Sequence, residues 1–225
     1  MTFLLKQTRH REYTGFEEVA NTITHGLGAL FALVGMILLG MWAWQGGNTW
    51  QLVGTTVFGL TMVVLYAAST IYHAVPEALE RTKSRWQRYD QSAIFLLIAG
   101  SYTPFILSNM RTTIGWTLLA FVWTIALVGI FGELTERTNS TKIRVGIYLL
   151  MGWSCLMAIG PILQVMPMSG MALIALGGAA YSLGVVFFLW RQLRYHHAVW
   201  HLFVLAGTGF HYMAVVLYAL PEAVA

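Results

Sequence analysis

The sequence has little charge and almost no cysteine. Only 10% of its 225 residues are Asp, Glu, Lys or Arg, whereas 57% are hydrophobic and the mean hydropathy is +0.65. A soluble domain of this length could not bury so much apolar surface, which excludes a soluble fold. The single cysteine, Cys155, excludes an intrachain disulfide and is expected to be a small buried hydrophobe. The longest polar connection, residues 76–90, is too short for a second domain.

Seven apolar runs are long enough to cross a bilayer, which takes about 17 to 25 helical residues. Because the runs are continuous rather than short and alternating, transmembrane helices are favoured over strands. The sequence therefore predicts an all-α integral membrane protein, one domain of residues 1–225 in which a seven-transmembrane helix bundle follows an N-terminal segment, 1–18, without a signal-peptide core. The predicted spans are 19–44, 51–74, 91–109, 113–132, 143–163, 168–190 and 197–220.

Twelve of the thirteen Lys and Arg residues fall on one side of these spans. Since positively charged loops stay in the cytoplasm, we expect a cytoplasmic N-terminus and an outside C-terminus in the inner (cytoplasmic) cell membrane. This topology, together with attraction to anionic lipid headgroups, accounts for the net charge of +4. We therefore expect membrane lipids as partners, and infer neither a nucleic-acid partner nor a soluble protein partner. The charges on the cytoplasmic side are Lys6, Arg9, Arg11, Arg81, Lys83, Arg85, Arg88, Arg137, Lys142, Arg144, Arg191 and Arg194, and Arg111 lies opposite.

Polar side chains at the cytoplasmic ends of three spans indicate a metal site. His197 and His201 lie one helical turn apart at the start of the last span, so their rings share a face and can bind one ion, while His196 is out of register. His73 ends the second predicted span and Asp90 precedes the third. Three neutral imidazoles leave one tetrahedral position open for water, which is typical of catalytic zinc.

Two residues at the same depth could act in catalysis. Ser69 lies one turn before His73 and places a hydroxyl beside it. Asp90 could be a fourth ligand, could hold the water as a general base, or could simply cap its helix. Each group alone is compatible with an interfacial or packing role, but their common depth predicts a zinc site with Ser69 and Asp90 as its catalytic residues.

A second polar cluster lies at the start of the first span. Glu17, Asn21 and His25 are spaced at i, i+4 and i+8, so they follow one helix face at the depth of the metal. We expect them to support the ligands or to contact a lipid headgroup. The alternative is a polar first turn in which Glu17 or Glu18 favours the positive end of the helix dipole.

Three further polar residues lie away from the predicted ligands, and one of them, His211, is counted with the residues expected to support the site or to contact substrate. His211 is ten residues beyond His201 and thus about 15 Å deeper, too far to be a ligand. We expect it to bond Tyr102 or Thr103, or else to line a lipid-accessible cavity. Glu133 and Glu136 follow the fourth span and are expected to be solvated loop charges.

The combination of Ser69-x-x-x-His73, Asp90 and His197-x-x-x-His201 within seven spans resembles the hemolysin III family and its relatives, the progestin and adipoQ receptor family and the alkaline ceramidases. The segments EEVANTITHGLG, DQSAIFLLIAGSYTPF and HAVWHLFVLAGTGFH also resemble bacterial hemolysin III proteins. The resemblance implies that the three histidines bind zinc and that Asp90 contacts it through water. It also implies lipid amide hydrolysis, as in the ceramidases.

These features favour a zinc-dependent hydrolase of a lipid amide or ester that influences membrane lipid homeostasis. The predicted depth of the site matches that of such bonds in a bilayer. One alternative is a non-enzymatic lipid-sensing or membrane-homeostasis protein in which zinc holds helices together. The family name also suggests a cytolytic pore or channel, which is disfavoured because conduction pathways place polar groups along the full membrane depth.

Overall fold

A computed structural model describes residues 13–137 and 140–220, all in helices and their connections with no strand among them. These residues form seven spans that are long and apolar enough to cross a membrane, which confirms the predicted bundle. Most of the predicted N-terminal segment 1–18 lies outside the described residues. The elements are α1 (Gly15–Gln45), α2 (Thr49–Ala74), α3 (Glu80–Asn109), α4 (Thr113–Leu134), α5 (Thr141–Trp153), the 3₁₀ helix η1 (Ser154–Ala158), α6 (Ile159–Val165), α7 (Met168–Leu189) and α8 (His196–Tyr218).

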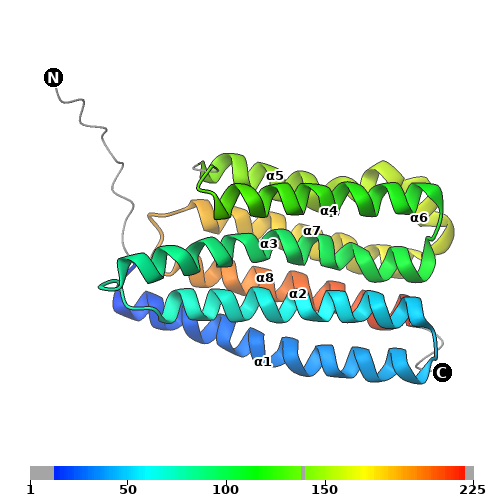
Figure 1. Cartoon of the computed structure of the whole chain (residues 1–225), viewed down its shortest axis with the longest axis horizontal. Helices are drawn as coiled ribbons and strands as arrows, with labels where there is room; N and C mark the ends of the chain where they lie inside the picture. The colour runs from blue at the N-terminus through cyan, green and yellow to red at the C-terminus, as the bar shows by residue number, and fades with distance from the viewer. Residues whose placement is uncertain (1–12, 138–139, 221–225) are drawn as a thin grey trace.

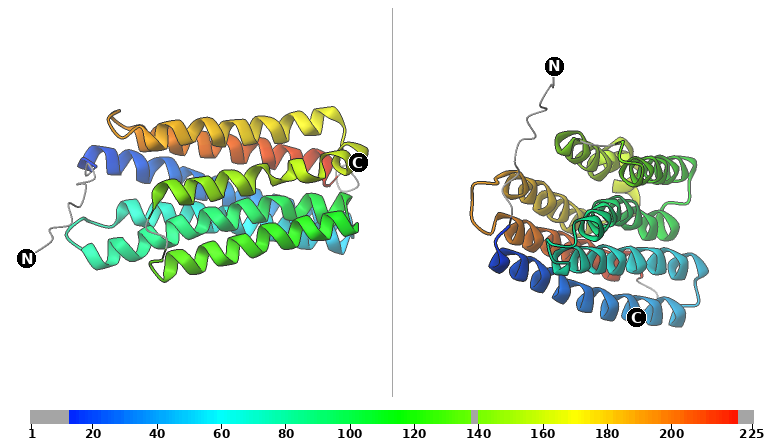
Figure 2. Two further views of the ribbon diagram at one scale, coloured as in Figure 1. Left: turned by 90° about the horizontal axis from the view of Figure 1, so that it is seen from above. Right: turned by 60° about the vertical axis from the view of Figure 1, so that its left-hand side comes forward.

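The helices lie side by side along the long axis of the molecule (Figure 1). Helices α1 to α4 are neighbours in chain order, and α7 pairs with α8. Helix α8 also packs against α1, which brings the first and last helices together (Figure 2). As a result α1, α3 and α8 begin, and α2 ends, at the same end of the bundle, on the left in Figure 1. We call this the polar end.

Side-chain caps define where several helices begin. At α1, the Thr14 hydroxyl accepts from the Glu17 backbone N–H at 3.3 Å, and the Glu17 carboxylate accepts from the Thr14 N–H at 2.9 Å. This reciprocal capping box satisfies two N–H groups that the helix itself leaves unpaired. Helices α2, α4 and α5 have simpler, one-sided caps, in which the side chain of Asn48, Thr112 or Ser140 accepts from a backbone N–H of the first turn.

Helix α3 begins earlier than predicted. The stretch 76–90 was expected to connect two spans, but helix begins at Glu80 and continues to Asn109. Glu, Arg, Lys and Gln are strong helix formers, so the helix extends beyond its apolar run. Asp90 is therefore about three turns inside the helix and does not cap it. The residues assigned to a loop that lie in the helix are Arg81, Lys83, Arg85 and Arg88.

The fifth span was predicted as one helix, 143–163, and is broken near its middle. Helix α5 ends at Trp153, a 3₁₀ turn follows, and α6 begins at Ile159. Pro161 explains the break, because proline has no N–H and its ring clashes with the carbonyl four residues earlier, that of Met157. The backbone before it tightens into the 3₁₀ form.

Tyr102 of α3 supplies hydrogen bonds at this break. Its hydroxyl lies 2.8 Å from the carbonyl oxygens of both Met151 and Gly152, to which it can donate, and it accepts from the Cys155 N–H at 3.1 Å. Backbone groups freed inside a membrane need such partners. Cys155, expected to be buried, is only half-buried at this irregular segment.

The expectation that Glu133 is a solvated loop charge is wrong. Its side chain is buried, and its carboxylate accepts from the Arg144 Nε at 2.6 Å across the α4–α5 hairpin. Glu136 is exposed, as expected, and pairs with Arg88. The difference arises because Arg144 lies within the first turns of α5, opposite the last turn of α4.

Replacing Glu133 with alanine should destabilise the bundle far more than replacing Glu136. Breaking a buried pair by removing one partner costs about 3 to 5 kcal/mol, whereas exposed pairs contribute roughly 0 to 1 kcal/mol. Denaturation of the detergent-solubilised protein measures both changes, with Glu136→Ala as the matched control. Equal losses of unfolding free energy in the two variants would contradict the conclusion that the Glu133–Arg144 pair is buried and the Glu136–Arg88 pair is exposed.

Candidate metal centre

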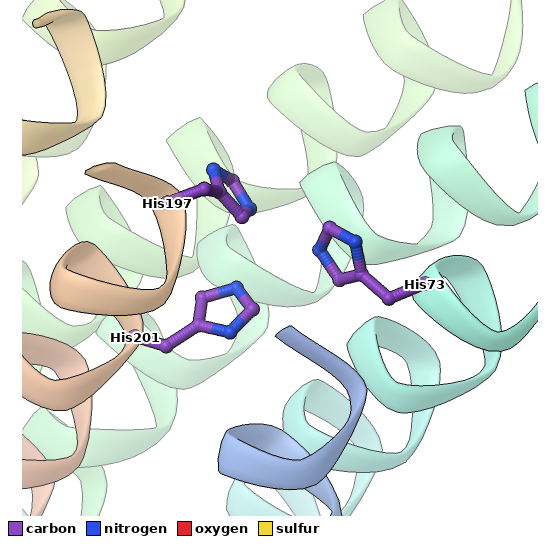
Figure 3. A group of neighbouring side chains, drawn as sticks. All are labelled: His73, His197 and His201. Atoms are coloured by element: carbon purple, nitrogen blue, oxygen red, sulfur yellow. The ribbon is translucent and has the colours of Figure 1, made fainter. Parts of the chain in front are cut away.

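Three histidines form a buried group at the polar end. The rings of His73 from α2 and of His197 and His201 from α8 point toward one another (Figure 3). Each offers one ligand atom, and these atoms all lie within 4.8 Å of one another. The ring centroids are 4.6 to 5.1 Å apart. The structure thus brings together all three predicted ligands in a group that could hold a metal ion.

Hydrogen bonds at Nδ1 leave Nε2 of two rings to face the centre. The Nδ1 of His73 lies 2.5 Å from the Glu18 carboxylate, which can only accept, and its buried Nε2 has no hydrogen-bond partner within the described chain. The Nδ1 of His201 lies 3.0 Å from the Thr24 hydroxyl, whose own hydrogen points to backbone carbonyls. Metal-binding imidazoles are held in this way, so the donor set fits zinc.

Asp90 and Ser69 lie beside this group without belonging to it. Asp90 is absent from the compact set of ligand atoms, but it lines the same cavity as Ser69, His197 and His201. The Ser69 hydroxyl of α2 is close enough to the Asp90 carboxylate to interact with it.

The Glu17 side chain reaches the start of α8. Its carboxylate accepts from the backbone N–H of Tyr195 at 3.0 Å, in addition to closing the capping box. Tyr195 precedes α8 and has a left-handed backbone, with φ of 57°. Glu17 therefore stabilises the turn that leads into His197.

Asn21 and His25 contact the histidine group and the Glu18 carboxylate beside it. The Asn21 amide donates to the Glu18 carboxylate at 3.4 Å, next to the Nδ1 of His73. The His25 ring stacks on His201 with centroids 3.4 Å apart and an interplanar angle of 13°. Both side chains are buried. The predicted second cluster thus lies against the histidines, where it can support them.

His211 does not bond Tyr102 or Thr103, so that expectation is wrong. Its Nε2 donates to the Ile174 carbonyl at 3.3 Å, and its ring meets Tyr181 edge-on at 5.5 Å. The reason is that α7, not α3, packs against this face of α8. His211 does line the cavity described below, as the other expectation required, and access of lipid to that cavity stays a prediction.

Sequence reasoning missed four residues around the site. Glu18 could have been found, because it shares a helix face with Asn21 and His25 at i, i+3 and i+7. The other contacts join distant parts of the chain and have no local signal. The missed residues are Tyr13, whose ring lies 5.3 Å from that of His197, together with Glu18, Thr24 and Lys83.

Comparison with known proteins decides the family. Residues 13–212 match a family described as haemolysin-III related. The chain belongs to the hemolysin III family. It is 40% identical over 218 residues to Hemolysin-3 of Bacillus cereus, which covers 97% of this chain and 98% of that protein. The Hemolysin-3 homolog of Bacillus subtilis (strain 168) is 38% identical over 208 residues, covering 92% and 97%.

A more distant relative is the human Monocyte to macrophage differentiation factor, 29% identical over 216 residues, or 91% of this chain and 85% of that protein. The resemblance to the hemolysin III family noted from the motifs is thereby confirmed. Together with the seven apolar spans, it identifies a multi-pass membrane protein of the bacterial cell membrane.

In this hemolysin III family member, a cavity of about 640 Å³ adjoins the histidine group. At the polar end it is lined by Ser69, Asp90, His197 and His201. It continues between α3, α5, α7 and α8 past largely apolar side chains to Met166 and His211. The site therefore opens into an apolar chamber inside the bundle.

Proposed function

We propose that this protein is a zinc-dependent hydrolase that cleaves an amide or ester bond of a membrane lipid and thereby influences lipid homeostasis. The observation that carries the proposal is the buried imidazole group, with Asp90 and Ser69 beside it, at one end of an apolar cavity. Three imidazoles without a fourth protein ligand are the donor set of a catalytic zinc.

The residues of the chain divide the chemistry between them. A zinc ion held by the three histidines would supply a Lewis acid that makes water nucleophilic near neutral pH. In this proposal Asp90 would take the proton of the attacking water as a general base and return it to the departing amine or alkoxide. The Ser69 hydroxyl would orient the Asp90 carboxylate.

The cavity supports a lipid as the substrate. An acyl chain can occupy its largely apolar interior while the amide or ester remains beside the histidines. The histidines lie at helix ends, near the depth at which such bonds sit in a bilayer. The charge distribution predicts that this is the cytoplasmic side.

A purely structural ion is less well supported, because protein contacts already join the helices at the polar end. Glu17 bonds the backbone before α8, and Glu18 bonds both His73 of α2 and Lys83 of α3. The helices that carry the site are thus held together by the chain itself. An ion bound there would not be needed to hold the helices together and could act in catalysis.

The direct test is hydrolysis by the purified zinc-loaded protein. An N-acyl sphingoid lipid and a diacyl phospholipid should be offered separately, and released fatty acid measured by mass spectrometry. We expect release from one class, its loss on chelation and its recovery when zinc is restored. Stoichiometric zinc without turnover of either lipid would reject the hydrolase, and absence of zinc would reject the metal centre as well.

A further inference from the structure

Helix α1 contributes no ligand, yet its Glu18 contacts a ligand ring and a buried cation at once. One carboxylate oxygen lies 2.5 Å from the His73 Nδ1, and the other lies 2.6 Å from the Lys83 Nζ. The side chains of His73, Glu18 and Lys83 are 0%, 13% and 9% exposed. Little water competes for these contacts, so both are strong charge-assisted hydrogen bonds.

Lys83 is itself held in place from several directions. Its ammonium group donates to the Val75 carbonyl at 3.1 Å, just beyond the end of α2, and to Glu77 at 2.9 Å. It also lies 5.3 Å from the centre of the Tyr72 ring. Lys83 therefore fixes the position of the Glu18 carboxylate relative to the helix end that carries His73.

The three ligand rings differ in what lies behind them. His73 has a carboxylate at Nδ1, and His201 has the neutral hydroxyl of Thr24. The buried Nδ1 of His197 has no hydrogen-bond partner among residues 13–137 and 140–220. A carboxylate behind a metal-binding imidazole fixes its tautomer and ring orientation and makes it a more basic ligand. His73 is thus the ring that the protein orients most firmly.

We propose that Glu18, clamped by Lys83, is a positioning residue of the metal centre, holding the Nε2 of His73 toward the ion and strengthening it as a donor. This inference rests on the proposed zinc site. It adds that the affinity of the site depends on a residue of α1 that never touches the metal.

Zinc affinity of the purified full-length protein, measured by competition with a chelator, tests this role. Glu18→Gln removes the charge and should weaken zinc binding about 10- to 100-fold. Lys83→Met should weaken it less, because Glu18 keeps its charge but loses its clamp. Glu77→Gln is the matched control: its side chain contacts the same Lys83 but is 60% exposed and does not reach His73, so its contribution to the clamp is small and the affinity should stay close to that of the wild type.

A cobalt-substituted protein gives a second readout that a merely structural role would not move. The visible absorption of Co²⁺ should shift in Glu18→Gln, because this change weakens the hydrogen bond to the Nδ1 of His73. It should remain unchanged in Glu77→Gln, which leaves that hydrogen bond in place. If Glu18→Gln does not fold, Glu18→Asp, which keeps the charge at a shorter reach, should bind zinc more weakly than wild type.

The outcomes separate this inference from the metal centre itself. Unchanged affinity and an unchanged cobalt spectrum in Glu18→Gln, in a protein whose His73→Ala variant loses zinc, would overturn the positioning role alone. A wild-type protein that binds no zinc would overturn both.

Discussion

His201→Ala should abolish both zinc binding and lipid hydrolysis while the bundle remains folded. Removing one of three buried imidazoles leaves too few ligands, so the loss of affinity should exceed the roughly 10- to 100-fold change expected for a residue that only hydrogen-bonds a ligand. His73→Ala should behave alike. Metal content, fatty-acid release and thermal stability of the same samples measure the three effects.

His196 provides the matched control for this prediction. It is buried next to His197, but its Nδ1 bonds the Phe187 carbonyl and it is not part of the ligand group. His196→Ala should therefore keep zinc and activity. Stoichiometric zinc in His201→Ala would contradict the proposed metal centre. If His201→Ala unfolds, and the wild-type protein unfolds to the same extent when a chelator removes its zinc, the ion has a structural role.

Asp90→Asn should lower kcat about 10²- to 10⁴-fold, the range typical of losing a general acid–base group. Zinc content and KM should change little, because Asp90 lies outside the set of ligand atoms and the variant is nearly isosteric. Steady-state kinetics and metal analysis measure the two properties. Ser69→Ala should give a smaller loss, since its hydroxyl acts through Asp90.

Glu80→Gln is the control for Asp90→Asn. Glu80 lies on the same helix and lines the same cavity, yet it is one of the first residues of α3 and not beside the histidines. Its removal should leave kcat unchanged. If Asp90→Asn lost its zinc, Asp90 would be a direct ligand and the proposed base would have to be found elsewhere.

The spans could be predicted because a lipid environment imposes one strong rule, namely apolar helices long enough to cross it. That rule says nothing about polar helix outside the apolar run, so the start of α3 at Glu80 was missed. The rule also cannot tell where an apolar helix is interrupted. The break in the fifth span depends on Pro161 and on Tyr102 of another helix.

The ligand group could be predicted from helical spacing combined with the side on which each helix ends. Its supports could not, because Glu18 and His73 are 55 residues apart, and Thr24 and His201 are 177 apart. Glu133 was misjudged for a similar reason. Its burial depends on Arg144 lying opposite, which only the packing of α4 against α5 determines.

The length of α1 connects the site to the physical state of the bilayer. Its 31 residues span about 46 Å at 1.5 Å per residue, more than a hydrocarbon core of about 30 Å. A helix that is too long for its membrane tilts, and the tilt changes with bilayer thickness. Because Glu18 and Thr24 of this helix contact two of the histidine rings, the geometry of the histidine group is coupled to the way α1 sits in the bilayer.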